Sequence, residues 1–257
     1  MQIEESNIFA VGCSFTWGES LQFFSGLDSV VWKEKRQSFP DTEKTLDEGQ
    51  LNFIKENRYP ALLAKKLNVE YITQAKNGGT NFESLLKAQY FYANENNRKK
   101  YKNFIIQVTH FSRDPIIFKL PNGEIIPISD VTTIRKEFDL FEMDDSKVLY
   151  DSYLYFYDKL YDFIKTLNDI NVYIICYPED SVDTLISHPL SKYFVKLNYN
   201  NIEYTSTDQL VKEHPLLQIQ NFFANKNLNK GDNHLTIDGH KIISDSIYNK
   251  ILLNKNL

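Results

Sequence analysis

Short apolar runs alternate with helical patterns along most of the chain, and this alternation limits the possible folds more than any other feature. Five runs have the length and composition of buried strands, at residues 7–11, 69–73, 104–108, 172–177 and 202–205. Amphipathic helical patterns separate or follow them, at residues 60–67, 82–97 and 149–167 and from about Asp238 onward. Strands that alternate with helices predict an α/β fold, in which crossover helices cover both faces of a mostly parallel five-stranded sheet.

Two stretches interrupt this alternation. Residues 28–57 are polar and charged, with scattered aromatic side chains, and we interpret them as an insertion. Residues 114–130 are a second insertion, where Asn122-Gly123 between two apolar runs predicts the turn of a small β-hairpin. Insertions after strands often form the walls of a substrate site, but surface decoration would leave the same pattern. With these insertions, residues 1–257 are expected to form a single domain.

Charge and cysteine content exclude several classes of protein. Nucleic-acid binding usually requires an excess of basic residues. The formal net charge of this chain is -5, so no nucleic-acid partner is expected. No apolar run approaches the roughly 20 residues of a membrane span. The acidic first residues do not resemble a signal peptide, so a cytoplasmic protein is expected. Cys13 and Cys176 lie far apart, without the spacing of a disulfide framework or a zinc site, and we expect neither a metal nor a cofactor.

Ser14 follows the first predicted strand directly, within the sequence G-C-S-F-T-W-G-E at residues 12–19. A serine after a glycine turn can present its hydroxyl at the carboxyl edge of the sheet, where open α/β sheets bind their ligands. A turn followed by an ordinary helix cap would use the same residue types. The position therefore makes Ser14 a candidate nucleophile that needs a partner.

A candidate partner occurs near the other end of the chain, where residues 231–243 read G-D-N-H-L-T-I-D-G-H-K-I-I. His234 follows Asp232 on a predicted loop that leads into the last amphipathic helix. A histidine beside a carboxylate can act as the general base that a serine hydroxyl needs to become a nucleophile. A loop histidine that hydrogen-bonds a backbone carbonyl is the structural alternative.

Together these two blocks resemble the SGNH (GDSL-type) hydrolase superfamily. Residues 75–81, A-K-N-G-G-T-N, resemble its second block, and the blocks follow the family order over most of the chain. Position 13 holds cysteine where the name-giving motif has aspartate, so the chain resembles a G-C-S-F-T variant branch. The resemblance implies a flavodoxin-like three-layer α/β/α sandwich, and hydrolysis or transfer of an ester-linked acyl group through an acyl-enzyme.

The resemblance also implies a role for each matching residue. Ser14 would attack the ester carbonyl, His234 would act as base and then as acid, and Asp232 would orient the imidazole. The backbone N–H groups of Ser14 and Gly78 would stabilise the oxyanion. The family acid usually stands three residues before the histidine, where this chain has Gly231. A backbone carbonyl in place of Asp232 therefore stays open as the group that orients His234.

The third family block departs most from the resemblance. It normally ends in G-x-N-D, whose asparagine completes the oxyanion hole, but residues 107–113 read Q-V-T-H-F-S-R. We expect Thr109 to supply the third donor, with His110 and Asn81 as alternatives. Loss of such a donor costs about 3–4 kcal/mol of transition-state stabilisation, so an active enzyme needs a substitute.

Two further residues are candidates for substrate binding. Trp17 lies beside the nucleophile, and the planar guanidinium of Arg113 could pair with a carboxylate or phosphate, although a structural ion pair is the commoner use. The resulting hypothesis is a serine esterase that hydrolyses a small acyl ester, such as an O-acetylated carbohydrate, and that substrate is its expected partner. The alternatives are an acyltransferase with the same site and a catalytically inactive binding module.

Overall fold

A four-stranded parallel sheet forms the centre of the computed structural model, which describes residues 6–27, 46–76, 78–110, 114, 116–119, 125–128, 145–226, 228 and 233–255. The strands are β1 (Ile8–Val11), β2 (Tyr71–Thr73), β3 (Asn103–Val108) and β6 (Asn171–Cys176). They lie in the order β2-β1-β3-β6, and each pair of neighbours is parallel. This is the order of a flavodoxin-like doubly wound sheet, so the predicted α/β fold class is confirmed.

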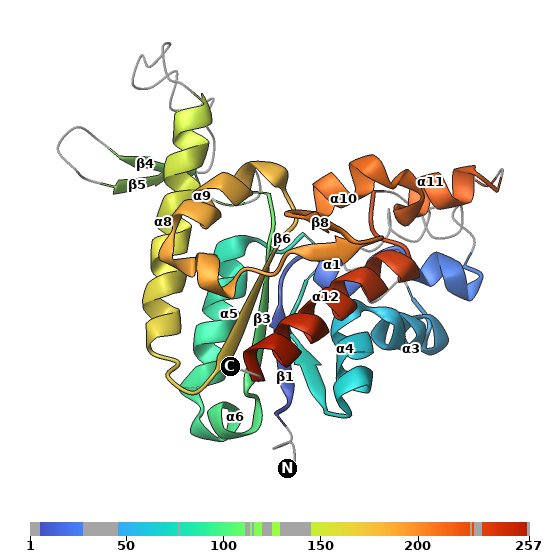
Figure 1. Cartoon of the computed structure of the whole chain (residues 1–257), viewed down its shortest axis with the longest axis horizontal. Coiled ribbons are helices and arrows are strands. Elements are labelled where there is room, and N and C mark those ends of the chain that lie inside the picture. Colours follow the sequence, from blue (N-terminus) through green and yellow to red (C-terminus); the bar gives the residue numbers. More distant parts are fainter. Residues whose placement is uncertain are drawn as a thin grey trace.

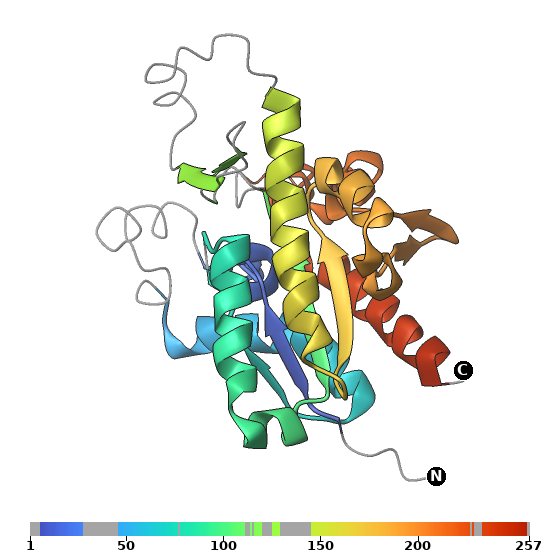
Figure 2. The ribbon, with the colours of Figure 1, turned by 90° about the vertical axis from the view of Figure 1, so that its left-hand side faces the viewer.

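Helices cover both faces of the sheet (Figure 1). The covering helices are α4 (Tyr59–Leu67), α5 (Asn81–Ala93), α8 (Asp145–Lys165) and α12 (Ile237–Lys255). The short helix α6 (Glu95–Lys100) follows α5 and buries none of its residues. Successive strand residues point to opposite faces, so Phe9 and Val11 pack with α5 and α8, whereas Ile8 and Ala10 pack with α4 and α12. Figure 2 shows α5 and α8 on the face of the sheet that is turned toward the viewer.

Shorter elements follow the carboxyl ends of the strands or connect the long helices. They are α1 (Ser14–Trp17), η1 (Leu21–Ser25), α3 (Glu48–Asn57), η4 (Glu179–Ser181), α9 (Val182–Ser187), η5 (Pro189–Tyr193), α10 (Thr207–Glu213), η6 (Pro215–Leu217) and α11 (Ile219–Ala224). Helix α3 occupies the end of the predicted insertion at residues 28–57, of which residues 28–45 lie outside the described part.

The predicted strand at residues 202–205 does not join the parallel sheet. Instead β8 (Ile202–Tyr204) pairs antiparallel with β7 (Leu197–Tyr199). Asn200 and Asn201 connect the two strands with φ of 53° and 64°, and positive φ at both turn residues favours a tight hairpin. A single bridge between Ile174 and Phe194 is the pairing on the outer side of β6. Among the described residues the central sheet therefore has four strands and not the predicted five.

The predicted helix at residues 82–97 is divided into α5 and α6. The side chain of Asn94 accepts hydrogen bonds from the backbone of Asn96 and Asn97 and so begins the second helix. Asparagine competes with helical backbone hydrogen bonds in this way, which explains the break within an otherwise helical pattern.

The predicted small hairpin is present as β4 (Ile116–Lys119) paired antiparallel with β5 (Ile125–Ile128). The Asn122-Gly123 turn that predicts it lies outside the described residues. Among the helices that the structure describes, none is both long enough and apolar enough to cross a membrane.

Candidate active site

Ser14 lies at the carboxyl end of β1, on a turn that requires a glycine. A Cβ atom on Gly12 would lie 2.2 Å from Thr16 Oγ1 and 3.1 Å from Gln107 Cβ, so only glycine fits this close approach. The chain then turns at once into α1, whose first residue is the buried Ser14. Gly18, with φ of 89°, ends this single helical turn, and its N–H donates to Ser14 O at 2.9 Å. The backbone that carries the Ser14 hydroxyl is therefore fixed on both sides, by Gly12 before it and by Gly18 after it.

His234 is brought to Ser14 by backbone pairing of the loop that precedes α12. Leu235 forms a bridge with Gln218, and the Ile219 N–H donates to the carbonyl of His234 at 2.9 Å. The imidazole Nε2 lies 2.7 Å from Ser14 Oγ, although 220 positions separate the two residues. This distance is within the range that a nucleophile and its general base require.

Aromatic rings support the imidazole on one side. The Phe15 ring lies 4.5 Å from the ring of His234 and 3.9 Å from the ring of Tyr177, measured between centroids. Phe15 follows the serine within α1, and Tyr177 follows the last strand of the sheet. The orientation of His234 is therefore set partly by residues from two strand ends.

Glu19 is a site residue that the sequence analysis missed. Its Oε2 atom lies 3.6 Å from His234 Nε2, and its side chain is only 4% exposed. Its N–H donates to Ser14 O at 3.0 Å, so the turn that carries the nucleophile also positions the carboxylate. One signal could have found it: Glu19 is the only charged residue between positions 6 and 27.

The second sequence block packs against the first. The Lys76 N–H donates to Gly12 O at 3.3 Å, and a Cβ atom on Gly79 would also lie 3.3 Å from that oxygen. Gly78 has φ of 73°, the left-handed region that favours glycine, and an added Cβ would meet no atom within 4 Å. Gly78, the predicted second oxyanion donor, thus lies on an open turn that reaches the end of β1.

Thr109 and Asn81 are joined at the end of β3. The Thr109 N–H donates to Asn81 Oδ1 at 2.8 Å, and the Asn81 amide donates to Thr109 O at 2.9 Å and to Asp114 Oδ2 at 2.8 Å. Both amide hydrogens of Asn81 are therefore used in holding the strand end to α5. The hydroxyl of Thr109 is buried, and within the described part of the chain it has no hydrogen-bond partner. Of these two residues, Thr109 retains a side-chain donor for a ligand.

His110, the other alternative donor, is directed toward a different group. Its Nε2 lies 3.9 Å from Asp208 Oδ2, and its ring packs edge-on against Tyr177 with centroids 5.0 Å apart. Burial raises the pKa of Asp208, and the nearby His110 opposes that rise. His110 thus lies at the same edge of the sheet as Thr109, but its imidazole faces the carboxylate of Asp208.

Of the remaining predicted residues, Trp17 does not lie in an open substrate site. Trp17 is 5% exposed and packs in an apolar cluster with Leu21, Ile219 and Phe223, which leaves little of the indole surface for a ligand. Asp232 and Arg113 lie outside the described residues.

A second group of polar side chains lies buried beneath α1. Thr16 Oγ1 donates to Gln107 Oε1 at 2.6 Å and lies 3.0 Å from the Tyr59 hydroxyl. The Tyr59 N–H donates to His240 Nδ1 at 3.3 Å. Burial, followed by the charges of His234 and Arg58, lowers the pKa of His240 to about 3. We call Thr16, Tyr59, Gln107 and His240 the buried network.

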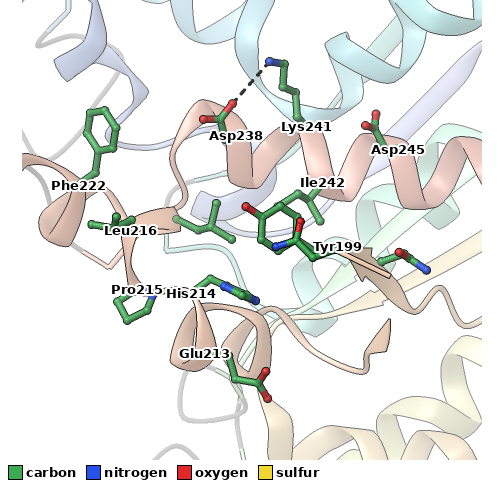
Figure 3. A pocket seen from close by; sticks show the side chains of 13 residues that line it. Tyr199, Glu213, His214, Pro215, Leu216, Phe222, Asp238, Lys241, Ile242 and Asp245 are labelled. Carbon is green, nitrogen blue, oxygen red and sulfur yellow. Dashed lines mark ion pairs between the residues drawn. The ribbon is translucent and has the colours of Figure 1, made fainter. Parts of the chain in front are cut away.

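A groove of about 830 Å³ lies on another part of the surface, between the β7–β8 hairpin, η6 and α12 (Figure 3). Tyr199 and Ile242 line it, and an ion pair of 3.5 Å joins Asp238 to Lys241 at its edge. Neither Ser14 nor His234 lines this groove. In the described ranges no group of three or more His, Cys, Asp or Glu side chains could hold a metal ion.

Comparison with known proteins gives no family model and no curated protein that matches the chain. Three solved structures illustrate what it is similar to. An acetyl xylan esterase from the rumen bacterium Butyrivibrio proteoclasticus has 11% identity and a TM-score of 0.47, with 100% of this chain and 65% of that chain covered. A lipase from a goat rumen metagenome has 13% identity and a TM-score of 0.46, with 94% of this chain and 95% of that chain covered.

The third is a putative lipolytic protein of the G-D-S-L family from Desulfitobacterium hafniense. It has 12% identity and a TM-score of 0.39, with 95% of this chain and 98% of that chain covered. This chain spans 65% of the length of the acetyl xylan esterase.

Proposed function

We propose that this protein is a serine esterase that hydrolyses small acyl esters, with O-acetylated carbohydrates as the first substrates to test. The observation that carries the proposal is the 2.7 Å contact between Ser14 Oγ and His234 Nε2. Many buried histidines bond a backbone carbonyl, but here the imidazole nitrogen meets a serine hydroxyl at the edge of the sheet where such folds bind ligands.

The reaction begins when Ser14 Oγ forms a bond to the ester carbonyl carbon and passes its proton to His234 Nε2. The tetrahedral intermediate carries a negative oxygen, for which the N–H groups of Ser14 and Gly78 and the Thr109 hydroxyl are the proposed donors. Collapse breaks the bond to the alcohol oxygen, which takes the proton from Nε2. Water then repeats these steps on the acyl-enzyme and releases the acid.

The proposal is tested by labelling the protein with a fluorophosphonate probe, which reacts covalently with an activated serine. We expect the wild type to be labelled and Ser14→Ala to remain unlabelled. Ser187→Ala is the matched control, since the exposed Ser187 hydroxyl donates to Asp183 O within α9, and it should be labelled like the wild type. Absence of label on the folded wild type would refute the proposal and favour an inactive binding module.

Esterase activity is then separated from acyl transfer by product analysis with an acetyl ester. A hydrolase releases acetate at the same rate with or without an added sugar. An acyltransferase forms an acetylated sugar, because the acceptor hydroxyl intercepts the acyl-enzyme in place of water. Formation of that product as the main outcome would assign the site to transfer.

A further inference from the structure

We propose that Glu19 is the carboxylate that stabilises the protonated form of His234 during the reaction. This role rests on the proposed function, and it differs from the assignment of Asp232 that the sequence blocks imply. The Glu19 side chain lies 3.6 Å from His234 Nε2, the same nitrogen that lies 2.7 Å from Ser14 Oγ.

The position of Glu19 suits a charge that appears only during the reaction. When Ser14 gives its proton to His234, the imidazole becomes positive at Nε2, and the carboxylate is within ion-pair distance of that atom. The side chains of Glu19 and His234 are only 4% and 12% exposed, so water screens their interaction weakly. The attraction therefore favours the transition state, in which the imidazole takes up the proton of Ser14.

The local fold holds the carboxylate and the nucleophile in one rigid unit. The carbonyl of Ser14 accepts hydrogen bonds from the N–H groups of both Gly18 and Glu19. The left-handed conformation of Gly18 reverses the chain there, which returns Glu19 toward the serine. A glutamate five residues after the nucleophile thus reaches the imidazole.

Two other described ionisable groups in this region carry no negative charge. His240, from the first turn of α12, is neutral because burial lowers its pKa to about 3, and Arg58 beside it is positive. The Ser14 hydroxyl is the proton donor. Asp232 precedes His234 outside the described residues and is tested separately below.

The experiment is an NMR titration of the His234 imidazole in the wild type, Glu19→Gln and Glu179→Gln, with His234→Gln to assign the signal. Loss of a negative charge at this distance is expected to move the titration of His234 to lower pH in Glu19→Gln. Glu179→Gln is the matched control, because Glu179 is ion-paired with Lys212 on the surface, and it should leave the titration unchanged. An unchanged His234 titration in folded Glu19→Gln would overturn the proposal.

A reciprocal measurement covers the case in which Glu19→Gln does not fold. Coupling between two sites acts equally in both directions, so loss of the imidazolium in His234→Gln should raise the pKa of the Glu19 carboxyl. A Glu19 titration that is the same in His234→Gln and wild type would overturn the role. The same His234 titration in Asp232→Asn shows which carboxylate has the larger effect, and a larger shift there than in Glu19→Gln would also overturn it.

The activity profile completes the test. In Glu19→Gln the acid limb of kcat/KM should move to lower pH, with a loss of about tenfold on the plateau, whereas a merely structural role would lower the rate at every pH alike. The NMR titration needs no substrate. A coupled Glu19–His234 pair without esterase activity would therefore refute the proposed function alone, and activity without coupling would refute the role of Glu19 alone.

Discussion

Two groups that each contain a histidine lie near the end of β1, and they differ in what surrounds the imidazole. In one, Ser14 meets His234, whose side chain is 12% exposed and faces a carboxylate. In the other, the buried network, His240 is 1% exposed and accepts the N–H of Tyr59. The two histidines are six positions apart in one sequence block, yet burial lowers the pKa of His240 to about 3. Access and a nearby negative charge, and not residue type, distinguish a base from a structural histidine.

The largest effect that would test this comparison is the loss of His234. His234→Gln should lower kcat/KM for an acetyl ester by about 10⁴-fold or more, because Ser14 loses its base. His240→Asn, which retains an acceptor for the Tyr59 N–H, should stay within about tenfold of wild type per folded molecule. Comparable losses in the two variants, measured on protein of verified fold, would show that the distinction is wrong.

The second effect concerns the unpartnered hydroxyl of Thr109. Thr109→Val, which keeps the shape and removes the donor, should lower kcat about 10²–10³-fold if this hydroxyl stabilises the oxyanion. Thr109→Ser retains the hydroxyl and should recover most of that loss. Steady-state kinetics with one ester tests this role. Equal rates for Thr109→Val and Thr109→Ser would show that the Thr109 hydroxyl is not an oxyanion donor.

The third effect is the dependence of stability on pH that follows from His240. The unfolded histidine titrates near pH 6.5 and the folded one near 3, so between these values the unfolded chain binds the extra proton. The free energy of unfolding should therefore fall by up to about 1.4 kcal/mol for each pH unit as the pH decreases through this window. Urea titrations at pH 6 and pH 4 should show a smaller decrease for His240→Asn than for the wild type. An identical decrease would mean that His240 is protonated in the folded state.

The smallest effect comes from the Tyr59 hydroxyl of the buried network. Tyr59→Phe removes the hydroxyl that lies 3.0 Å from Thr16 Oγ1 and should reduce the free energy of unfolding by about 1 kcal/mol. The rate of fluorophosphonate labelling should remain within about twofold of wild type, because Ser14 keeps its own contacts. A much slower reaction in a stable variant would show that the network also positions the nucleophile.

Local patterns were sufficient to predict most of the fold. Buried strands of the parallel sheet are apolar runs, and the helices between them carry apolar faces, so the α/β architecture could be predicted from residue type alone. The strand at residues 202–205 was assigned to the wrong sheet, because the Asn200-Asn201 turn that pairs it with β7 is a backbone conformation and not a hydropathy pattern.

The candidate site was predictable to a different extent. Ser14 and His234 stand in sequence blocks that can be recognised without coordinates. The contribution of Glu19 was not predicted, since its effect depends on a 3.6 Å distance to a residue more than 200 positions away. The same holds for Trp17, whose burial against Ile219 and Phe223 is a matter of long-range packing.

The sequence by itself determined which segments become strands and helices, because backbone geometry and hydrophobic periodicity act over a few residues. It also determined that a serine follows the first strand and a histidine precedes the last helix. Only the tertiary structure decided that Ser14 and His234 lie 2.7 Å apart and that the buried Glu19 faces the same imidazole nitrogen. It also decided that His240 is buried, which lowers its pKa to about 3. Distance and dielectric environment depend on how the two ends of the chain pack together, and no local pattern contains that information.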